Sequence, residues 1–338
     1  MNYEEKEAGE RIVNRILKQL TPENIQKEVR TIQAIELPPD VQRWVEEYEK
    51  VGDRSDFIWK WTYSAVQKIT LSSVTEEYKK SIWTTKTIST ILNSLIDDLA
   101  DKRKNKELLQ KAVKICLYQD TTFLNDPVLE KTEKEYLQLI KRLWEVLNER
   151  LKKYPRYEQF KECFLYDYLQ FLNSMHYSFL VNENPHSINL TECEMYTSHN
   201  IQGIISFTID LMCSPAFNEE ELGVLREIAW NAQRMGRIGN SVTTWEREVY
   251  ENDFTSEVFA YLLSEKLMSV NDLINGKEKE IIDEIKKIDV QGYFFKRWSE
   301  CYQRTSILGQ KVNSVNIGKL LSGLSDLINM HFISKGLK

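Results

Sequence analysis

Two sets of oxygen-bearing side chains stand far apart in this 338-residue sequence, each with the spacing of an α-helix. They are Asp97, Asp98 and Asp101 in the first set and Asn240, Thr244 and Glu248 in the second. Carboxylate, amide and hydroxyl oxygens are donors that Mg²⁺ prefers, and proteins often share this ion between one or two carboxylates and a substrate's phosphates. Together the two sets predict a site for magnesium and a diphosphate.

Helical geometry decides which of these side chains can act together. Asp97 and Asp101 share one face of a helix predicted over residues 81–102, whereas Asp98 lies about 100° further round and can bond neighbouring groups. The second set forms a single stripe on a helix predicted from residue 218 or 219 to about residue 251. The predicted metal ligands are Asp97, Asp101, Asn240, Thr244 and Glu248.

Neither set is strong evidence by itself, because acidic residues at helical spacing usually lie on a solvated face. Apolar residues precede and separate the aspartates, at 95–96 and 99–100, so the carboxylates are expected at the rim of a cavity. Each set occurs once, on its own long helix, and the sequence has no competing catalytic motif. The conjunction therefore favours a functional site.

The elements that hold these sets are predicted to be helices of one all-α bundle. The sequence is 42% hydrophobic with only 12 glycines and 7 prolines, and its apolar residues recur at three- and four-residue intervals. One such run covers residues 191–213. A single domain over residues 1–338 is expected, with residues 1–50 wrapping the outside of the bundle.

Net charge and hydropathy limit the partners and the compartment. A formal net charge of −6 and a pI near 5.5 give no electrostatic reason to expect nucleic acid. No apolar run is long enough for a membrane span, and the acidic first residues are unlike a signal peptide, so a cytoplasmic protein is predicted. The sequence is equally compatible with a monomer and a homodimer.

The two sets also carry a family resemblance. The segment 97–101, Asp-Asp-Leu-Ala-Asp, is similar to the aspartate-rich motif of the class I terpene synthases, and Asn240, Thr244 and Glu248 are similar to their second metal motif. The chain therefore resembles a class I terpene synthase, or terpene cyclase, of the single-domain microbial type. The resemblance implies the α-helical isoprenoid synthase fold, three Mg²⁺ ions and an isoprenoid diphosphate substrate.

The activity that this resemblance implies is that of a carbon–oxygen lyase. Magnesium assists ionisation of the diphosphate ester, and the carbocation cyclises in a closed apolar pocket, releasing diphosphate and a terpene hydrocarbon or alcohol. A C20 substrate, linear or bicyclic, is preferred over C15. The expected diphosphate contacts are Arg247, Arg237 and His199. The candidate pocket residues are Trp83, Thr87, Asn93, Ser94, Phe171 and Phe207.

The chain departs from the family pattern in two places, one of which is the missing C-terminal Arg-Tyr pair of many relatives. The other is Glu194, which stands where related bacterial enzymes carry an arginine that senses the diphosphate on a broken helix. Gly203 is the candidate position for this helix break. Two other classes of protein stay open, namely a chain-elongating prenyltransferase and a non-catalytic helical binding protein derived from the fold. The prenyltransferases carry a second aspartate-rich motif in place of the Asn-Thr-Glu stripe, so the stripe favours the cyclase. The intact pair of ligand sets argues against a non-catalytic protein.

Overall fold

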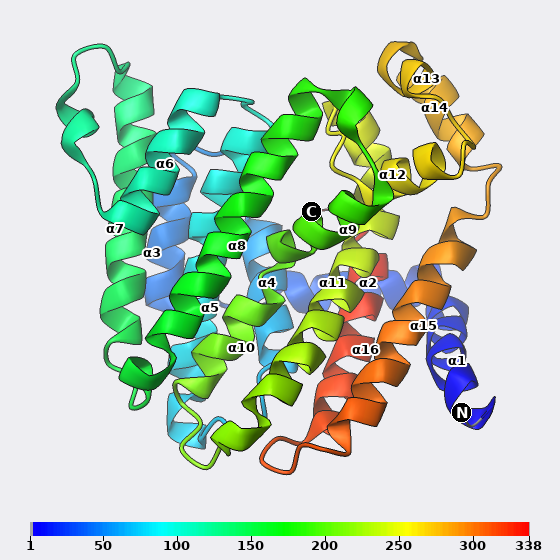
Figure 1. The fold of residues 1–338 in the computed structure, drawn as a ribbon, viewed down its shortest axis with the longest axis horizontal. Helices are drawn as coiled ribbons and strands as arrows, with labels where there is room; N and C mark the ends of the chain where they lie inside the picture. The colour runs from blue at the N-terminus through cyan, green and yellow to red at the C-terminus, as the bar shows by residue number, and fades with distance from the viewer. Residues whose placement is uncertain (1–2, 338) are drawn as a thin grey trace.

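A computed structural model of the chain describes residues 3–337, whose regular elements are all helices (Figure 1). The predicted all-α fold class is confirmed. None of these helices has the length and apolar composition needed to cross a membrane. The α-helices are α1 Tyr3–Gln19, α2 Pro22–Gln33, α3 Pro39–Tyr48, α4 Asp56–Lys68, α5 Glu76–Asp101, α6 Lys106–Tyr118, α7 Lys131–Leu151, α8 Tyr157–Glu183, α9 Leu190–Thr197, α10 Gly203–Leu211, α11 Leu222–Glu251, α12 Glu257–Ser264, α13 Val270–Asn275, α14 Glu278–Ile285, α15 Val290–Gly309 and α16 Ile317–Ile333. The short 3₁₀ helices are η1 Thr122–Asn125, η2 Pro185–Ser187, η3 Ser198–Ile201 and η4 Glu219–Glu221.

Two long helices, α5 and α11, carry the two oxygen sets. From Ile82 onward nearly every side chain of α5 is buried, which is the pattern of a helix packed on all sides. α5 packs against α4, α7 and α8, and α11 packs against α10, α15 and α16. Gly239 of α11 lets α16 approach closely, because a Cβ at this position would lie 2.9 Å from the His331 ring.

The ends of α5 and α11 determine where the acidic residues lie. α5 begins at Glu76, before the predicted residue 81, because acidic side chains in the first turn complement the helix dipole. α11 ends where Asn252 adopts a left-handed conformation with a φ of 51°, a common way for a helix to stop. Asp253 therefore lies directly beyond the helix that carries the second set.

The first three helices pack on different parts of the bundle. α1 lies along α15 (Figure 1), α2 contacts α4, and α3 contacts α5. The contact between α1 and α15 is close, because a Cβ on Gly9 would lie 2.7 Å from the Cα of Ser299. Val13 and Ile16 of α1 belong to the hydrophobic core that extends through the bundle.

The amphipathic run over residues 191–213 is not one helix but is divided into α9, η3 and α10. The left-handed residue at the break is Gln202, with a φ of 59°, and not the candidate Gly203. Gly203 begins α10 and serves close packing instead, since a Cβ there would lie 3.0 Å from the Cβ of Gln233 on α11. The family resemblance therefore predicted the region of the break and missed its position by one residue.

Candidate active site

Residues of both oxygen sets line one cavity of about 440 Å³. This volume is within the range of pockets that enclose a small ligand. Of the residues predicted from sequence, the lining contains Asp97, Asp101, Asn240, Thr244, Glu248, Arg237, Arg247, Asn93, Ser94 and Phe171. The fold thus brings two distant segments of the chain to the same cavity.

Asp97 and Asp98 are neighbours in sequence but have different surroundings. Arg54, in the loop before α4, donates to Asp97 Oδ2 at 2.7 Å and to Asp98 Oδ1 at 2.7 Å. The Tyr48 hydroxyl donates to Asp98 Oδ2 at 2.9 Å. Both oxygens of Asp98 therefore accept hydrogen bonds from protein groups, and Asp98 lies outside the cavity lining that includes Asp97.

Asp101 belongs to a crowded group of carboxylates. Asn182 Nδ2 lies 3.4 Å from Asp101 Oδ1 and 3.4 Å from Asp253 Oδ1, so one amide bridges two carboxylates. The amide is oriented by its own oxygen, which accepts from the Phe254 N–H at 2.7 Å. Burial, followed by the charges of Asp253 and Asp97, raises the pKa of Asp101 well above its ordinary value. The charge of Arg237 acts in the opposite direction but does not offset burial and the two carboxylates.

The second set has the stripe geometry that its spacing predicts. The Thr244 hydroxyl donates to Glu248 Oε1 at 2.6 Å, and Asn240 Oδ1 accepts from Arg237 at 3.3 Å. The other carboxylate oxygen of Glu248 is buried and has no hydrogen-bond partner among the side chains of residues 9–337. Burial, followed by the charge of Asp253, raises the pKa of Glu248. A buried acceptor without a donor is costly, and a cation would remove that cost.

Two arginines of α11 line the cavity beside the second set. Arg237 is buried, donates to the Thr255 carbonyl at 2.8 Å and lies 4.0 Å from Glu257. Arg247 is 40% exposed and pairs with Glu251 at 3.2 Å. Because a guanidinium presents several donors in a planar fork, each arginine can bind an anion in the cavity while keeping a protein partner.

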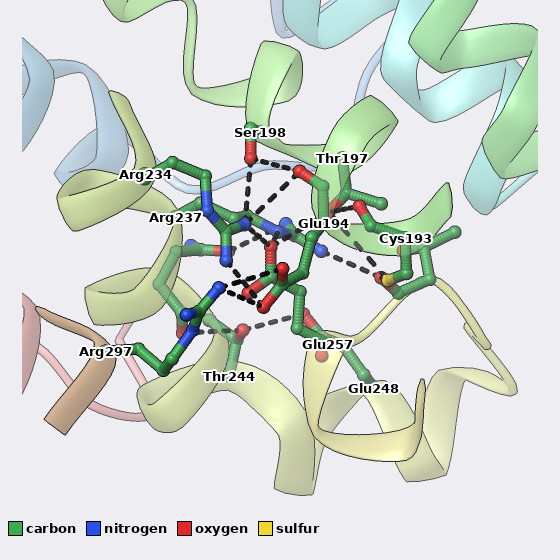
Figure 2. A network of polar contacts seen from close by, with 12 residues as sticks. Cys193, Glu194, Thr197, Ser198, Arg234, Arg237, Thr244, Glu248, Glu257 and Arg297 are labelled. Carbon is green, nitrogen blue, oxygen red and sulfur yellow. Dashed lines mark hydrogen bonds and ion pairs between the residues drawn. The ribbon is translucent and has the colours of Figure 1, made fainter. Parts of the chain in front are cut away.

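Glu194 lies on α9, where the resemblance places a diphosphate-sensing arginine, and two arginines of other helices hold it. Arg234 of α11 and Arg297 of α15 each lie 3.1 Å from its carboxylate. Figure 2 shows both guanidiniums pointing toward Glu194. Arg234 also donates to the fully buried Glu257 at 2.5 Å. Positive charge near this position thus comes from α11 and α15, and it is neutralised within the protein.

His199 lies outside the cavity lining, so it is not placed to contact an anion there. Its ring packs against Trp230 with ring centres 5.4 Å apart, and the Gln233 amide lies 3.4 Å from its Nδ1. Burial lowers the pKa of His199, which favours the neutral ring. The structure therefore assigns His199 a packing role between η3 and α11 in place of the predicted diphosphate contact.

Trp83, Thr87 and Phe207 also lie outside the lining, contrary to prediction. Trp83 is about 21 Å from Asp97 along α5, too far down the helix, and its ring N–H donates to the Thr70 hydroxyl at 3.1 Å. Thr87 is turned about 80° from Asp97 around the helix, and its hydroxyl donates to the Trp83 carbonyl at 2.8 Å. Phe207 is turned about 100° from the preceding residue of α10, which does line the cavity.

Among the polar residues of the site that sequence reasoning missed are Arg54, Asn182 and Asp253. Asp253 is five residues after Glu248, off the four-residue stripe, and reaches the site because α11 ends at Asn252. An acidic residue directly after an asparagine that can end a helix was the available signal. Arg54 gave no signal, because its contact depends on the path of the loop between α3 and α4.

We expect the Arg54→Ala substitution to lower the free energy of unfolding by about 3 kcal/mol, because it leaves two buried or half-buried carboxylates without their cation. The measurement is urea denaturation of the metal-free protein. Arg304→Ala is the matched control, since Arg304 is 53% exposed and its partner Glu227 is 45% exposed. The control should change stability by less than about 1 kcal/mol. Equal effects of the two substitutions would contradict the structural role of Arg54.

Comparison with solved structures assigns this arrangement of helices to the class I terpene synthase fold. The particular protein that it resembles is isoprene synthase from leaves of grey poplar, Populus x canescens, with a TM-score of 0.58 and 13% sequence identity. The match covers 91% of this chain and 53% of that one. A second structure of the same enzyme, in complex with three Mg²⁺ ions and dimethylallyl-S-thiolodiphosphate, matches with a TM-score of 0.56 and 12% identity, over 91% of this chain and 54% of that one.

These comparisons establish the fold, and the chain spans about half the length of the plant enzyme that it matches. No protein-family profile matches the sequence. No curated protein matches it in sequence. Sequence identity of 12–13% does not carry an activity from one chain to the other.

Proposed function

We propose that the chain is a magnesium-dependent class I terpene synthase that ionises an isoprenoid diphosphate and cyclises the resulting carbocation. The observation that supports this best is the meeting of the two oxygen sets at one cavity. The fold match adds support, because the plant enzyme with this fold has been captured with Mg²⁺ and a diphosphate analogue. The C20 substrate remains the preferred chain length.

The donor set fits magnesium on chemical grounds. Asp97, Asp101 and Glu248 are carboxylates at the cavity, and burial raises the pKa of each of them. Perturbed carboxylates in a cavity are typical of functional sites. Among the side chains that the structure describes, those of residues 9–337, no three His, Cys, Asp or Glu are grouped closely enough to hold a metal by themselves. Magnesium suits such a site because it readily takes its remaining ligands from water and substrate phosphates.

In this proposal Asp97, Asp101, Asn240, Thr244 and Glu248 would hold the magnesium ions. When bound, the ions neutralise the diphosphate and make it a better leaving group. Arg237 and Arg247 bind the departing diphosphate through their guanidinium groups. Two aromatic side chains of the described lining, Phe171 and Trp61, offer ring faces that stabilise a carbocation.

The test is incubation of the purified protein with Mg²⁺ and each of four diphosphates, linear C10, C15 and C20 and a bicyclic C20, with assay of released diphosphate and mass spectrometry of extracts. Asp97→Ala and Asn240→Ala should each lower release by at least about 10²-fold. Asp283→Ala, at an exposed position of α14, is the control and should have no effect.

Two outcomes would replace the proposal. Product that forms only when isopentenyl diphosphate is added identifies a chain-elongating prenyltransferase. If the wild-type protein is folded and releases no diphosphate in a magnesium-dependent way from any of the four substrates, the non-catalytic binding protein is favoured.

A further inference from the structure

Several polar side chains in the cavity wall have a hydrogen-bonding atom without a partner in the described part of the chain. Three of these atoms belong to neutral side chains of α5 and α10, and they are Ser89 Oγ, Asn93 Nδ2 and Ser206 Oγ. These residues are buried, with exposed fractions of 2%, 0% and 9%. Buried polar atoms are almost always satisfied, and an orphan of this kind usually marks a bound water, an ion or a chemical role.

The unpartnered atoms are not accidents of side-chain orientation. The Tyr168 hydroxyl donates to Asn93 Oδ1 at 2.7 Å, so the amide oxygen is engaged and its NH₂ group is left for the cavity. Thr90, the neighbour of Ser89 on α5, donates to the Lys86 carbonyl at 3.0 Å, whereas Ser89 makes no such bond. The cavity wall therefore offers one amide donor and two hydroxyl groups that can each donate and accept.

These groups lie close to the place where a carbocation would form. Asn93 is one turn before Asp97 on α5, about 6 Å along the helix axis. Ser206 is on α10, which packs against α5. A buried water needs two to four polar partners, and the wall provides three. A purely hydrocarbon substrate would leave all three unsatisfied, at about 1–3 kcal/mol each.

We infer that Ser89, Asn93 and Ser206 hold a water molecule that ends the reaction, so that the product is a terpene alcohol. This inference rests on the proposed function. A lone pair of the water oxygen forms a C–O bond with the cationic carbon. The resulting oxonium loses one proton to an oxygen of the departed diphosphate. No oxidant or reductant takes part, because the carbocation and water already contain every atom and electron of the alcohol.

The test is turnover of the same four diphosphates in H₂¹⁸O, with mass spectrometry of the extracts. The expected main product is an alcohol that carries ¹⁸O. Alcohol formed by the Asp97→Ala variant measures spontaneous solvolysis and is subtracted. Asn93→Leu and Ser206→Ala should each lower the ratio of alcohol to hydrocarbon by about tenfold, since each removes a hydrogen bond to the water.

Thr87→Val is the matched control, because this buried hydroxyl of α5 lies outside the cavity lining and donates to its own helix. Its alcohol-to-hydrocarbon ratio should equal that of the wild type. Magnesium-dependent release of diphosphate with hydrocarbon as the main product overturns the water inference and leaves the proposed function standing. An unchanged ratio in both Asn93→Leu and Ser206→Ala also overturns it. Absence of magnesium-dependent release overturns both.

Discussion

Replacing Asp101 with asparagine is expected to make the metal-free protein more stable while removing its magnesium-dependent activity. Asp101 is buried beside Asp253 and Asp97, and the charge of each raises its pKa further after the effect of burial. An amide of the same size keeps the shape of the side chain and removes one buried negative charge. We expect the free energy of unfolding to rise by about 1–2 kcal/mol and diphosphate release to fall by at least about 10²-fold.

The pH dependence of stability follows from the same carboxylates. Asp97, Asp101 and Glu248 all have a pKa that folding raises. The native state therefore binds more protons than the unfolded chain between the ordinary and the raised pKa values. The resulting contribution to stability is full below the ordinary values of 3.8 and 4.5 and is lost as the pH rises through the raised values. Added Mg²⁺ should stabilise the protein more at pH 8 than at pH 5.5, because it binds deprotonated carboxylates.

The measurement for both effects is the Tm of the wild type and Asp101→Asn across this pH range, with and without Mg²⁺. The variant should show a shallower fall of Tm with pH and a smaller shift on adding Mg²⁺. Asp283→Asn, an exposed aspartate of α14 replaced in the same way, should behave as the wild type. A variant that is less stable than the wild type at pH 8 without metal would contradict the crowding of charge at Asp101.

Breaking the ion pair between Lys86 and Asp210 is expected to destabilise the protein by about 3–5 kcal/mol. The Lys86 ammonium lies 2.6 Å from Asp210 Oδ1, and the two side chains are 2% and 0% exposed. Asp210 Oδ2 also accepts from the Leu71 N–H at 2.9 Å, which ties α10 to the turn before α5. Lys86→Met would leave a charged carboxylate buried without its cation. Asp210→Asn would leave the Lys86 ammonium buried without its anion.

A double-mutant cycle separates the pair from other effects of the two substitutions. Urea denaturation of Lys86→Met, Asp210→Asn and the double variant should give a coupling energy of about 2 kcal/mol or more, because the double variant leaves no unpaired charge. The exposed pair of Lys277 and Glu280 is the matched control, with side chains 81% and 66% exposed. Its coupling should be below about 0.5 kcal/mol. A coupling energy below about 0.5 kcal/mol for both pairs would contradict the prediction that the buried pair stabilises the protein.

Sequence patterns predicted those features that are set within a single helix, namely its extent and which of its residues share a face. The all-α fold and the approximate extents of α5 and α11 follow from apolar spacing. The shared face of Asp97 and Asp101 follows from their separation of four residues. The meeting of the two sets at one site was predicted from the chemistry of their donors and from their conjunction, and the family resemblance agreed with it. Trp83 and Thr87 were placed wrongly because the depth of the cavity along α5, and the angle that it covers, depend on neighbouring helices.

Residues in loops were the least predictable part of the site. Arg54 and Asp253 lie outside regular helices, where no periodicity links a residue to a face. Their contacts with Asp97 and Asn182 depend on how α3 meets α5 and on where α11 ends. The unpartnered atom of Asn93 was equally hidden, because a one-dimensional pattern shows the residue type and not which of its atoms is already bonded.

The bonds from Tyr48 and Arg54 to Asp98 have a consequence for recombining this chain with others of the same fold. A chimera whose junction falls between α3 and α5 would exchange these two donors while keeping the acceptor. Asp98, with a side chain only 4% exposed, would then be a carboxyl group enclosed by protein without the two donors that bond it. A junction placed before α3 takes Tyr48, Arg54 and Asp98 from the same parent chain. The segment that precedes α4 and helix α5 should therefore always come from one parent.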